Sequence, residues 1–273
     1  MEVHAHSHTA DPDPSTSSGH RGRKKWTHYF WEFLMLFLAV FCGFLAENFR
    51  EHQVEHRREK QYARELYDEF LADSIAVANK ISLRLDKEKD MDYLRNYFKD
   101  SSLTSLPRQF YPAYTTVMYL VNTYTFEPKD GILSQLKSSG SLRYFKNTTL
   151  QKLFGDISVS INNLRYRNDQ EYQFFANPIK LFDLKYYDFN WMNELRKRDE
   201  NATAIDLIHQ YRKGNTIIPA SILNVSSFDR GEAANMISFY KQMIVSTQTL
   251  QMNDYITTNH KLLQELRQNY NLK

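Results

Sequence analysis

An apolar run without charges dominates the first fifty residues of the chain. Fourteen consecutive residues, 33–46, carry no charge and lie between Glu32 and Glu47. Flanking aromatic residues extend the apolar run to 21 residues, 29–49. A helix of that length covers about 30 Å, the thickness of the hydrocarbon core of a bilayer. The pattern therefore predicts a transmembrane anchor over residues 26–49, with aromatic residues at its first end suited to the interface.

A cleaved signal peptide and a soluble core helix both fit the apolar run less well. A signal peptide also follows a basic segment, but a small-residue cleavage motif should come after it. Here the run continues at once into a highly charged segment. A core helix of a soluble protein normally has a polar face, and residues 33–46 have none. An uncleaved anchor is therefore favoured.

Beyond the anchor, the pattern predicts one long stalk helix over residues 50–98. Its first part contains neither Gly nor Pro and alternates acidic with basic residues. Alternating signs are typical of a solvated helix face and not of a surface that binds nucleic acid. An apolar stripe at steps of four and seven then begins, which predicts packing on one face. The stripe comprises Tyr62, Leu66, Phe70, Val77, Ile81 and Leu85.

The middle of the chain has clearer helix boundaries in some places than in others. Prolines and a Ser/Thr cluster predict a loop over residues 99–113, and a helix is expected over about 114–125. Residues 177–230 are dense in aromatic side chains and lack a clear period, so an irregular region is expected there. Its aromatic residues fit either a small helical core or an exposed recognition surface, and the core is favoured.

A helical hairpin is expected around residues 130–165. Gly140 is predicted to stop its first helix in the left-handed conformation. Asn147 or Thr148 is predicted to cap the second. The hairpin is interpreted as structural, because it carries no basic face that could recognise DNA.

Apolar residues recur at helical spacing over residues 229–270 and predict a long C-terminal helix. Two long helices, one at each end of a domain, are expected to pack in antiparallel fashion. The predicted fold is mainly α. One N-terminal transmembrane helix continues into the stalk, and an antiparallel helical bundle completes the soluble domain of residues 50–273.

Composition supports a helical protein and argues against several kinds of chemistry. Only 8 Gly and 7 Pro occur in 273 residues, and the net charge of +3 is too balanced for binding nucleic acid through phosphates alone. The single cysteine, Cys42, lies within the apolar run and excludes an intrachain disulfide. No hydrolase, nucleotide-binding or zinc-protease motif is present. We therefore expect no enzyme activity, catalytic residues or cofactor.

The first 25 residues form a polar segment without apolar periodicity and are expected to be disordered. His4, His6 and His8 alternate there and are weak candidates for metal binding. A solvated tail with incidental histidines is favoured over a metal site, because no carboxylate is placed to orient the rings.

Charge on the two sides of the anchor suggests its orientation. An unbroken basic cluster precedes the anchor, whereas acidic residues interleave with the basic ones after it. Positive charge is retained in the cytoplasm. We therefore expect a single-pass protein of the cell inner membrane with its large domain in the periplasm.

The anchor and its flanks resemble a known family. The segment HYFWEFLMLFLAVFCGFLAENFREH, followed by RREKQYARELYDEFLADS, is similar to an uncharacterised family of single-span membrane proteins of Bacteroidota. The later segment LSQLKSSGSLRYFKNTTL resembles a second recurring element of that family. The resemblance covers residues 26–80 and 130–160. It implies a membrane location and a helical architecture, and it implies no catalytic residue.

Two functions are compatible with these features. The first is a membrane-anchored helical protein that acts in interaction or sensing, with the stalk as its link. The second is a structural subunit of an oligomeric inner-membrane complex. Ala39, Gly43 and Ala46 share one side of the anchor and favour close helix packing, with Glu32 and Glu47 at its ends. The expected partners are the lipid bilayer and either a protein or further copies of the chain, and the pattern does not identify a ligand.

Overall fold

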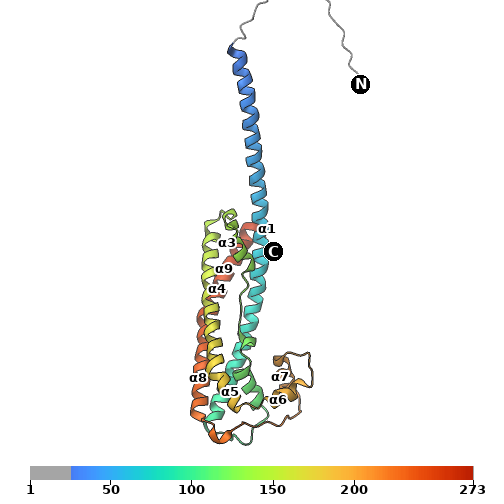
Figure 1. The fold of residues 1–273 in the computed structure, drawn as a ribbon, viewed down its shortest axis with the longest axis vertical. Helices are drawn as coiled ribbons and strands as arrows, with labels where there is room; N and C mark the ends of the chain where they lie inside the picture. Colours follow the sequence, from blue (N-terminus) through green and yellow to red (C-terminus); the bar gives the residue numbers. More distant parts are fainter. Residues whose placement is uncertain (1–25, 273) are drawn as a thin grey trace, which may run out of the picture. The chain divides into compact units, whose positions relative to one another are not determined.

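The computed structural model describes residues 26–272, and every regular element among them is a helix (Figure 1). The first and longest helix, α1, runs Trp26–Asp100. The chain forms two compact units, which meet in the sequence between Val54 and Glu55. The polar segment with His4, His6 and His8 lies outside the described residues.

Long helices build the second unit around the part of α1 that begins at residue 55. They are α4 (Thr148–Phe174), α8 (Arg230–Ser246) and α9 (Asn253–Tyr270). Residues near the start of this part of α1 contact α9, and residues nearer the end of α1 contact α8, which precedes α9 in the chain. Asn259 donates to the carbonyl oxygen of Phe70 at 3.0 Å, whereas Lys87 donates to the hydroxyl of Tyr240 at 3.1 Å. These helices therefore run in opposite directions.

A π-helical turn, η6 (Thr247–Met252), joins α8 to α9 and changes which residues face the interior. In α8 the buried series includes Tyr240 and Ile244, followed by Thr247. At the end of η6 it resumes at Met252 instead of Leu250, which is 60% exposed. A π turn inserts one residue into the helical repeat. The expected helix over 229–270 is thus present. Helical spacing predicts that Leu250 is buried, which is wrong, whereas Leu266 further along is buried as the spacing predicts.

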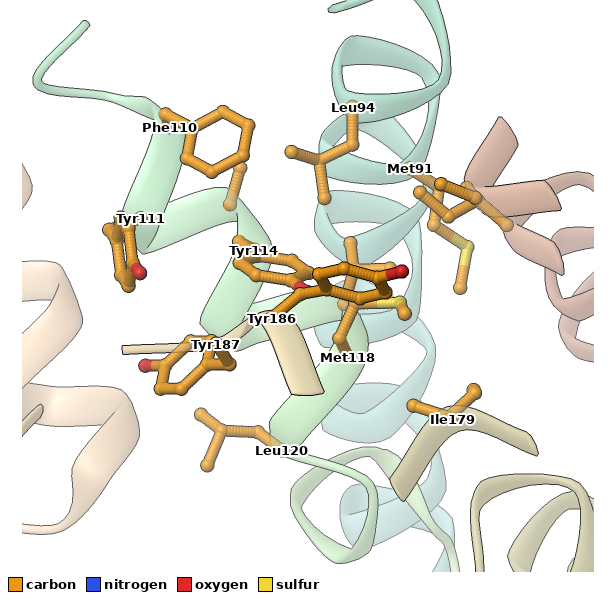
Figure 2. Close-up of a cluster of buried hydrophobic side chains, with 14 of the residues drawn as sticks. Met91, Leu94, Phe110, Tyr111, Tyr114, Met118, Leu120, Ile179, Tyr186 and Tyr187 are labelled. Carbon is orange, nitrogen blue, oxygen red and sulfur yellow. The ribbon is translucent and has the colours of Figure 1, made fainter. Parts of the chain in front are cut away.

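Two hydrophobic clusters lie along α1. The first packs Leu66 and Phe70 of α1 against α4 and α9. The second is rich in aromatic residues and packs Met91 and Leu94 of α1 against α2 (Phe110–Tyr114) and the segment that follows. Figure 2 shows Phe110 and Tyr114 on this segment beside Leu94 of α1. Rings throughout this cluster meet at tilted or edge-on angles, as in the pair of Tyr111 and Tyr114.

The segment 130–165 contains the two expected helices. α3 (Gly131–Ser138) is followed by Gly140 with φ 70° and ψ 10°, a left-handed conformation that glycine adopts without steric penalty. The Asn147 side chain accepts from the backbone N–H of Leu150 at 3.1 Å and caps α4. α4 extends to Phe174, nine residues past the expected end of the hairpin.

The expected loop over 99–113 and helix over 114–125 are displaced in the structure. α2 begins at Phe110 and contains Pro112, and the π turn η1 (Thr115–Tyr119) continues it. Proline is tolerated in a first helical turn because the backbone N–H there has no intrahelical partner. The helical segment therefore covers residues 110–119 instead of the expected 114–125.

The expected irregular region over 177–230 is largely helical. It contains α5 (Lys180–Tyr186), α6 (Phe189–Arg196) and α7 (Ala204–Lys213). Asp188 and Thr203 cap α6 and α7 by accepting backbone N–H bonds, which is a start signal that aromatic density obscured. The side chains of Phe182, Tyr186, Tyr187 and Trp191 are buried, which agrees with the core interpretation of the aromatic residues.

Asp183 of α5 is a buried carboxyl group beside the aromatic cluster. Asp183 is 2% exposed, and neither of its carboxyl oxygens has a hydrogen-bond partner among the described residues. Burial raises the pKa of Asp183 to about 8, and the nearby hydroxyl of Tyr114 offsets only part of that shift. The group is therefore protonated in the folded protein at neutral pH.

We predict that Asp183 makes the domain less stable as pH rises. The unfolded chain loses this proton near pH 4 and the folded chain near pH 8, so the free energy of unfolding should fall across that interval and level off above it. The slope contributed by one proton is at most about 1.4 kcal/mol per pH unit. Denaturant unfolding of the purified protein in detergent, measured from pH 5 to pH 9, tests this.

The control is Asp183→Asn, because asparagine has nearly the same shape as protonated aspartic acid but does not ionise. Burial also raises the pKa of Glu69, Asp73 and Asp90, so only the difference between the two proteins reports on Asp183. The two proteins should have similar stability at pH 5, and Asp183→Asn should be the more stable at pH 9. Parallel profiles would contradict a proton on Asp183.

Candidate functional site

The apolar surface of residues 26–49 is the most distinctive exposed feature of the chain. α1 is the one helix among the described residues that is long and apolar enough to cross a membrane. None of its most apolar 18-residue window is buried. Trp26 is 85% exposed, and Trp31 is 60% exposed. A surface of this kind marks a site of interaction with a membrane or with protein.

The two sides of this segment differ in side-chain size. Ala39, Gly43 and Ala46 fall within about 60° of one another at 100° per residue, and no atom lies within 4 Å of a Cβ built on Gly43. The opposite side carries a ladder of phenylalanines. Rings of Phe33 and Phe37 stack at 6.2 Å, and the next pair, Phe37 and Phe41, stacks at 5.9 Å. One side thus allows close approach of another helix, whereas the other is bulky.

The two acidic residues at the ends of the apolar run both have partners on the same helix. The carboxylate of Glu32 lies 3.1 Å from the Nε2 atom of His28. The carboxylate of Glu47 accepts two bonds from the guanidinium of Arg50, at 2.5 and 2.9 Å. These pairs place polar groups at each end of the apolar run, where a membrane-spanning helix meets the interface.

A groove in the second unit runs between α4 and α8. Two adjoining hollows of about 560 and 860 Å³ share Phe174, Pro178 and Phe239 as lining residues. Phe239 is 54% exposed, and its ring lies 4.9 Å from that of Phe174. Pro178 lies in the π turn η4 (Phe175–Ile179), which connects α4 to α5. π turns recur at functional sites because they displace side chains from the regular helical position.

Amide side chains line the rim of this groove beside charged ones, namely Arg167, Asp169, Lys185 and Glu232. Gln173 lies on the α4 side, whereas Asn235 and Gln242 lie on the α8 side. All three are exposed. Each primary amide offers both a donor and an acceptor. The groove can therefore bury an apolar side chain and hydrogen-bond to the backbone of a polypeptide.

A buried ion pair fixes the helices behind the groove. Arg84 of α1 binds both carboxylate oxygens of Glu171 of α4, at 2.6 and 3.3 Å. The same guanidinium donates to the carbonyl oxygen of Ile244 of α8 at 3.2 Å. Bidentate pairing of this kind restricts geometry as well as contributing energy. It holds α1, α4 and α8 in one arrangement.

Lys87 lies one turn further along α1 and is fully buried. Its ammonium group lies 4.6 Å from the ring centre of Tyr124 and 4.7 Å from that of Tyr240. Burial lowers the pKa of Lys87 to about 7, and the negative charge of Glu171 offsets part of the effect. A partly neutral amine can act as a nucleophile. Because the residue is 0% exposed, it cannot reach a ligand, and a structural role follows.

Metal-binding and acid–base chemistry have little basis among the described residues. No group of three His, Cys, Asp or Glu side chains there could hold a metal ion. The ionisable groups with the largest pKa shifts are buried in the interior and do not line the groove. The groove itself was missed by the sequence analysis, because its walls are separated by some sixty residues in the chain. The exposed Phe239 beside the buried Tyr240 is the one local signal of it.

Comparison with known proteins gives this site no precedent. No protein-family model, no curated protein and no solved structure matches the chain. The chemistry of the site rests on its own geometry.

Proposed function

We propose that the chain is a single-pass membrane protein whose helical domain binds a protein partner and has no catalytic role. One observation carries the proposal, namely that the apolar side chains of residues 26–49 are all left unburied by the chain itself. Transfer of such a surface from water into hydrocarbon is worth about 25 cal/mol per Å². A bilayer covers the whole surface at once, as a helix of this length requires.

The proposed location is the cell inner membrane, with the large domain in the periplasm as an antiparallel helical bundle. The basic cluster before the anchor supports this orientation, because such clusters stay in the cytoplasm. The architecture is that of the Bacteroidota family that residues 26–80 and 130–160 resemble. Neither a nucleic acid nor a cofactor forms part of the proposal.

The groove between α4 and α8 is the proposed binding surface. Its proposed occupant is an extended segment of a partner protein with apolar side chains. The aromatic floor of Phe174 and Phe239 supports this choice, as do the amides on both rims. An extended segment has free backbone donors and acceptors, and primary amides can hydrogen-bond to both. Grooves lined by aromatic side chains bind extended peptides in known modes of recognition.

A second function is favoured by the small face of the anchor. Ala39, Gly43 and Ala46 would let another membrane helix approach closely, and close packing is a main source of helix association in lipid. A structural subunit of an oligomeric inner-membrane complex would use this face. The groove favours the first function, because a purely structural anchor has no need of it.

We predict that protease added to intact spheroplasts removes the domain after Phe49 and spares residues 1–25. The physical reason is that the bilayer shields the cytoplasmic side. An epitope tag at each end, detected by immunoblotting, reports which part survives. Spheroplasts lysed before digestion are the control, in which both tags should be lost. A protected domain with an exposed N-terminal tag would reverse the proposed orientation.

We predict that a photo-reactive benzoylphenylalanine at position 239 cross-links to a different protein in intact cells. The matched control is position 250, because Leu250 is 60% exposed on the same C-terminal segment and does not line the groove. Gln173→Ala should reduce the cross-link, because it removes an amide that would hydrogen-bond to the segment in the groove. Equal cross-linking at both positions, or an adduct of twice the mass of the chain, would contradict the proposed occupant.

A further inference from the structure

A cavity separate from the groove lies where α1, α2 and α7 meet. Its volume is about 450 Å³, within the range of about 300 to 1,000 Å³ that is usual for small-molecule sites. Gln109 and Arg212 on its lining are exposed, whereas Pro112 and Ala113 are buried. The cavity therefore opens to solvent and reaches into the interior. Its complete lining is Asp90, Tyr93, Arg108, Gln109, Pro112, Ala113 and Arg212.

Arg108 gives this cavity a positive charge that no carboxylate of the described residues neutralises. Its guanidinium donates to the backbone carbonyl oxygens of Tyr211, Arg212 and Thr216. The first two of these carbonyls belong to the last turn of α7, so the bonds cap that helix and hold the guanidinium in place. They use three of the five N–H groups of the guanidinium. Two donors and the whole charge are left for a ligand.

The other two charged groups of the cavity compensate each other. Arg212 donates to a carboxylate oxygen of Asp90 at 2.6 Å. The Asp90 side chain is only 14% exposed, so this pair is partly shielded from water, and charges interact more strongly there than in water. The two positive charges of Arg108 and Arg212 and the one negative charge of Asp90 leave the cavity with a net charge of +1. One negative charge on a ligand balances it.

Tyr93 contributes a hydroxyl group that is buried and makes no hydrogen bond among the described residues. A buried polar atom without a partner is uncommon, because burial removes its bonds to water. Burial raises the pKa of Tyr93, and the nearby Gln109 amide offsets part of that shift. The hydroxyl therefore keeps its proton at neutral pH and can donate it to an acceptor in the cavity.

Arg108 also lines a second hollow, of about 290 Å³, whose other lining residues are apolar or aromatic. The rings of Tyr111, Trp191 and Tyr211 form part of it, and the ring centre of Trp191 lies 5.3 Å from that of each tyrosine. Aromatic side chains arranged in this way favour contact with a flat apolar group. A charged hollow and an aromatic hollow therefore adjoin at Arg108.

We propose that these two hollows bind a small organic molecule that carries a carboxylate group and a flat apolar group. The carboxylate accepts from Arg108 and from the hydroxyl of Tyr93, and the apolar group contacts Trp191. A planar carboxylate matches the planar guanidinium and can accept on both oxygens. A phosphate ester fits less well, because it carries up to two negative charges at neutral pH and would lie near Asp90. The groove shares no lining residue with these hollows, so this site does not depend on the proposed partner.

Fluorescence of Trp191 in the purified full-length protein in detergent tests the proposal. The chain has three tryptophans, so Trp26→Phe and Trp31→Phe leave Trp191 as the only one. The probe is 3-phenylpropanoate, and 3-phenylpropanamide is its uncharged control. The carboxylate should change the Trp191 emission until the site is saturated. The amide should bind at least about tenfold more weakly, because hydrogen bonds to a charged group are stronger than those to a neutral one.

An emission that does not respond to 3-phenylpropanoate at millimolar concentrations overturns the proposal. Equal affinity for the carboxylate and the amide also overturns it, because the site then recognises no charge. Tighter binding of phenyl phosphate than of 3-phenylpropanoate overturns the assignment to carboxylates and indicates a phosphate ligand instead.

Tyr93→Phe tests where the carboxylate binds. The hydroxyl makes no hydrogen bond among the described residues, so its removal should leave the unfolding temperature unchanged. It should weaken binding of 3-phenylpropanoate about tenfold, because the carboxylate loses one donor. The matched control is Tyr172→Phe, because Tyr172 is 48% exposed and lines neither hollow. Affinity that is the same in the two variants overturns the proposed site.

Discussion

The exposed apolar surface of residues 26–49 is the constraint on which the rest of the account depends. No other part of the described chain covers it, and no side chain along it is buried. Burial of apolar area is the dominant favourable term in folding and association, so covering this surface lowers the free energy. A bilayer does this for a single helix of this length, with aromatic residues and paired acidic groups at its ends.

The second unit depends on a different interaction, the buried ion pair of Arg84 and Glu171. A buried charge is tolerated only with a partner and further hydrogen bonds, which the carbonyl oxygens of Tyr124 and Ile244 supply. The pair joins helices that are distant in the sequence. It thereby fixes the inner faces of α4 and α8, whose outer faces carry Phe174 and Phe239. A fixed groove has a smaller ordering cost on binding than a flexible surface does.

Much of the fold follows from local sequence signals, and the errors have identifiable causes. The apolar run, the stop at Gly140 and the cap at Asn147 each depend on a few neighbouring residues. The π turns cannot be predicted from such local signals. One inserted residue does not alter the amino-acid composition of the helix, but it changes which residues face the interior, so that Met252 is buried and Leu250 is not. The caps Asp188 and Thr203 are present in the sequence, but the density of aromatic residues around them obscures the helix starts.

The candidate sites were only partly predictable for a related reason. The small face of Ala39, Gly43 and Ala46 lies within one helix, so spacing alone defines it. The groove requires two helices to lie side by side, and no pattern within either helix specifies that.

Insertion of the anchor is tested most directly by the reactivity of Cys42, the only cysteine in the chain. It lies in the middle of the apolar run, and a charged maleimide reacts only with a thiol that water reaches. In intact membranes Cys42 should not be labelled, and it should become labelled once the membrane is dissolved and the protein is denatured. Rapid labelling of Cys42 in sealed, intact membranes would show that residues 26–49 are in water and would contradict the account.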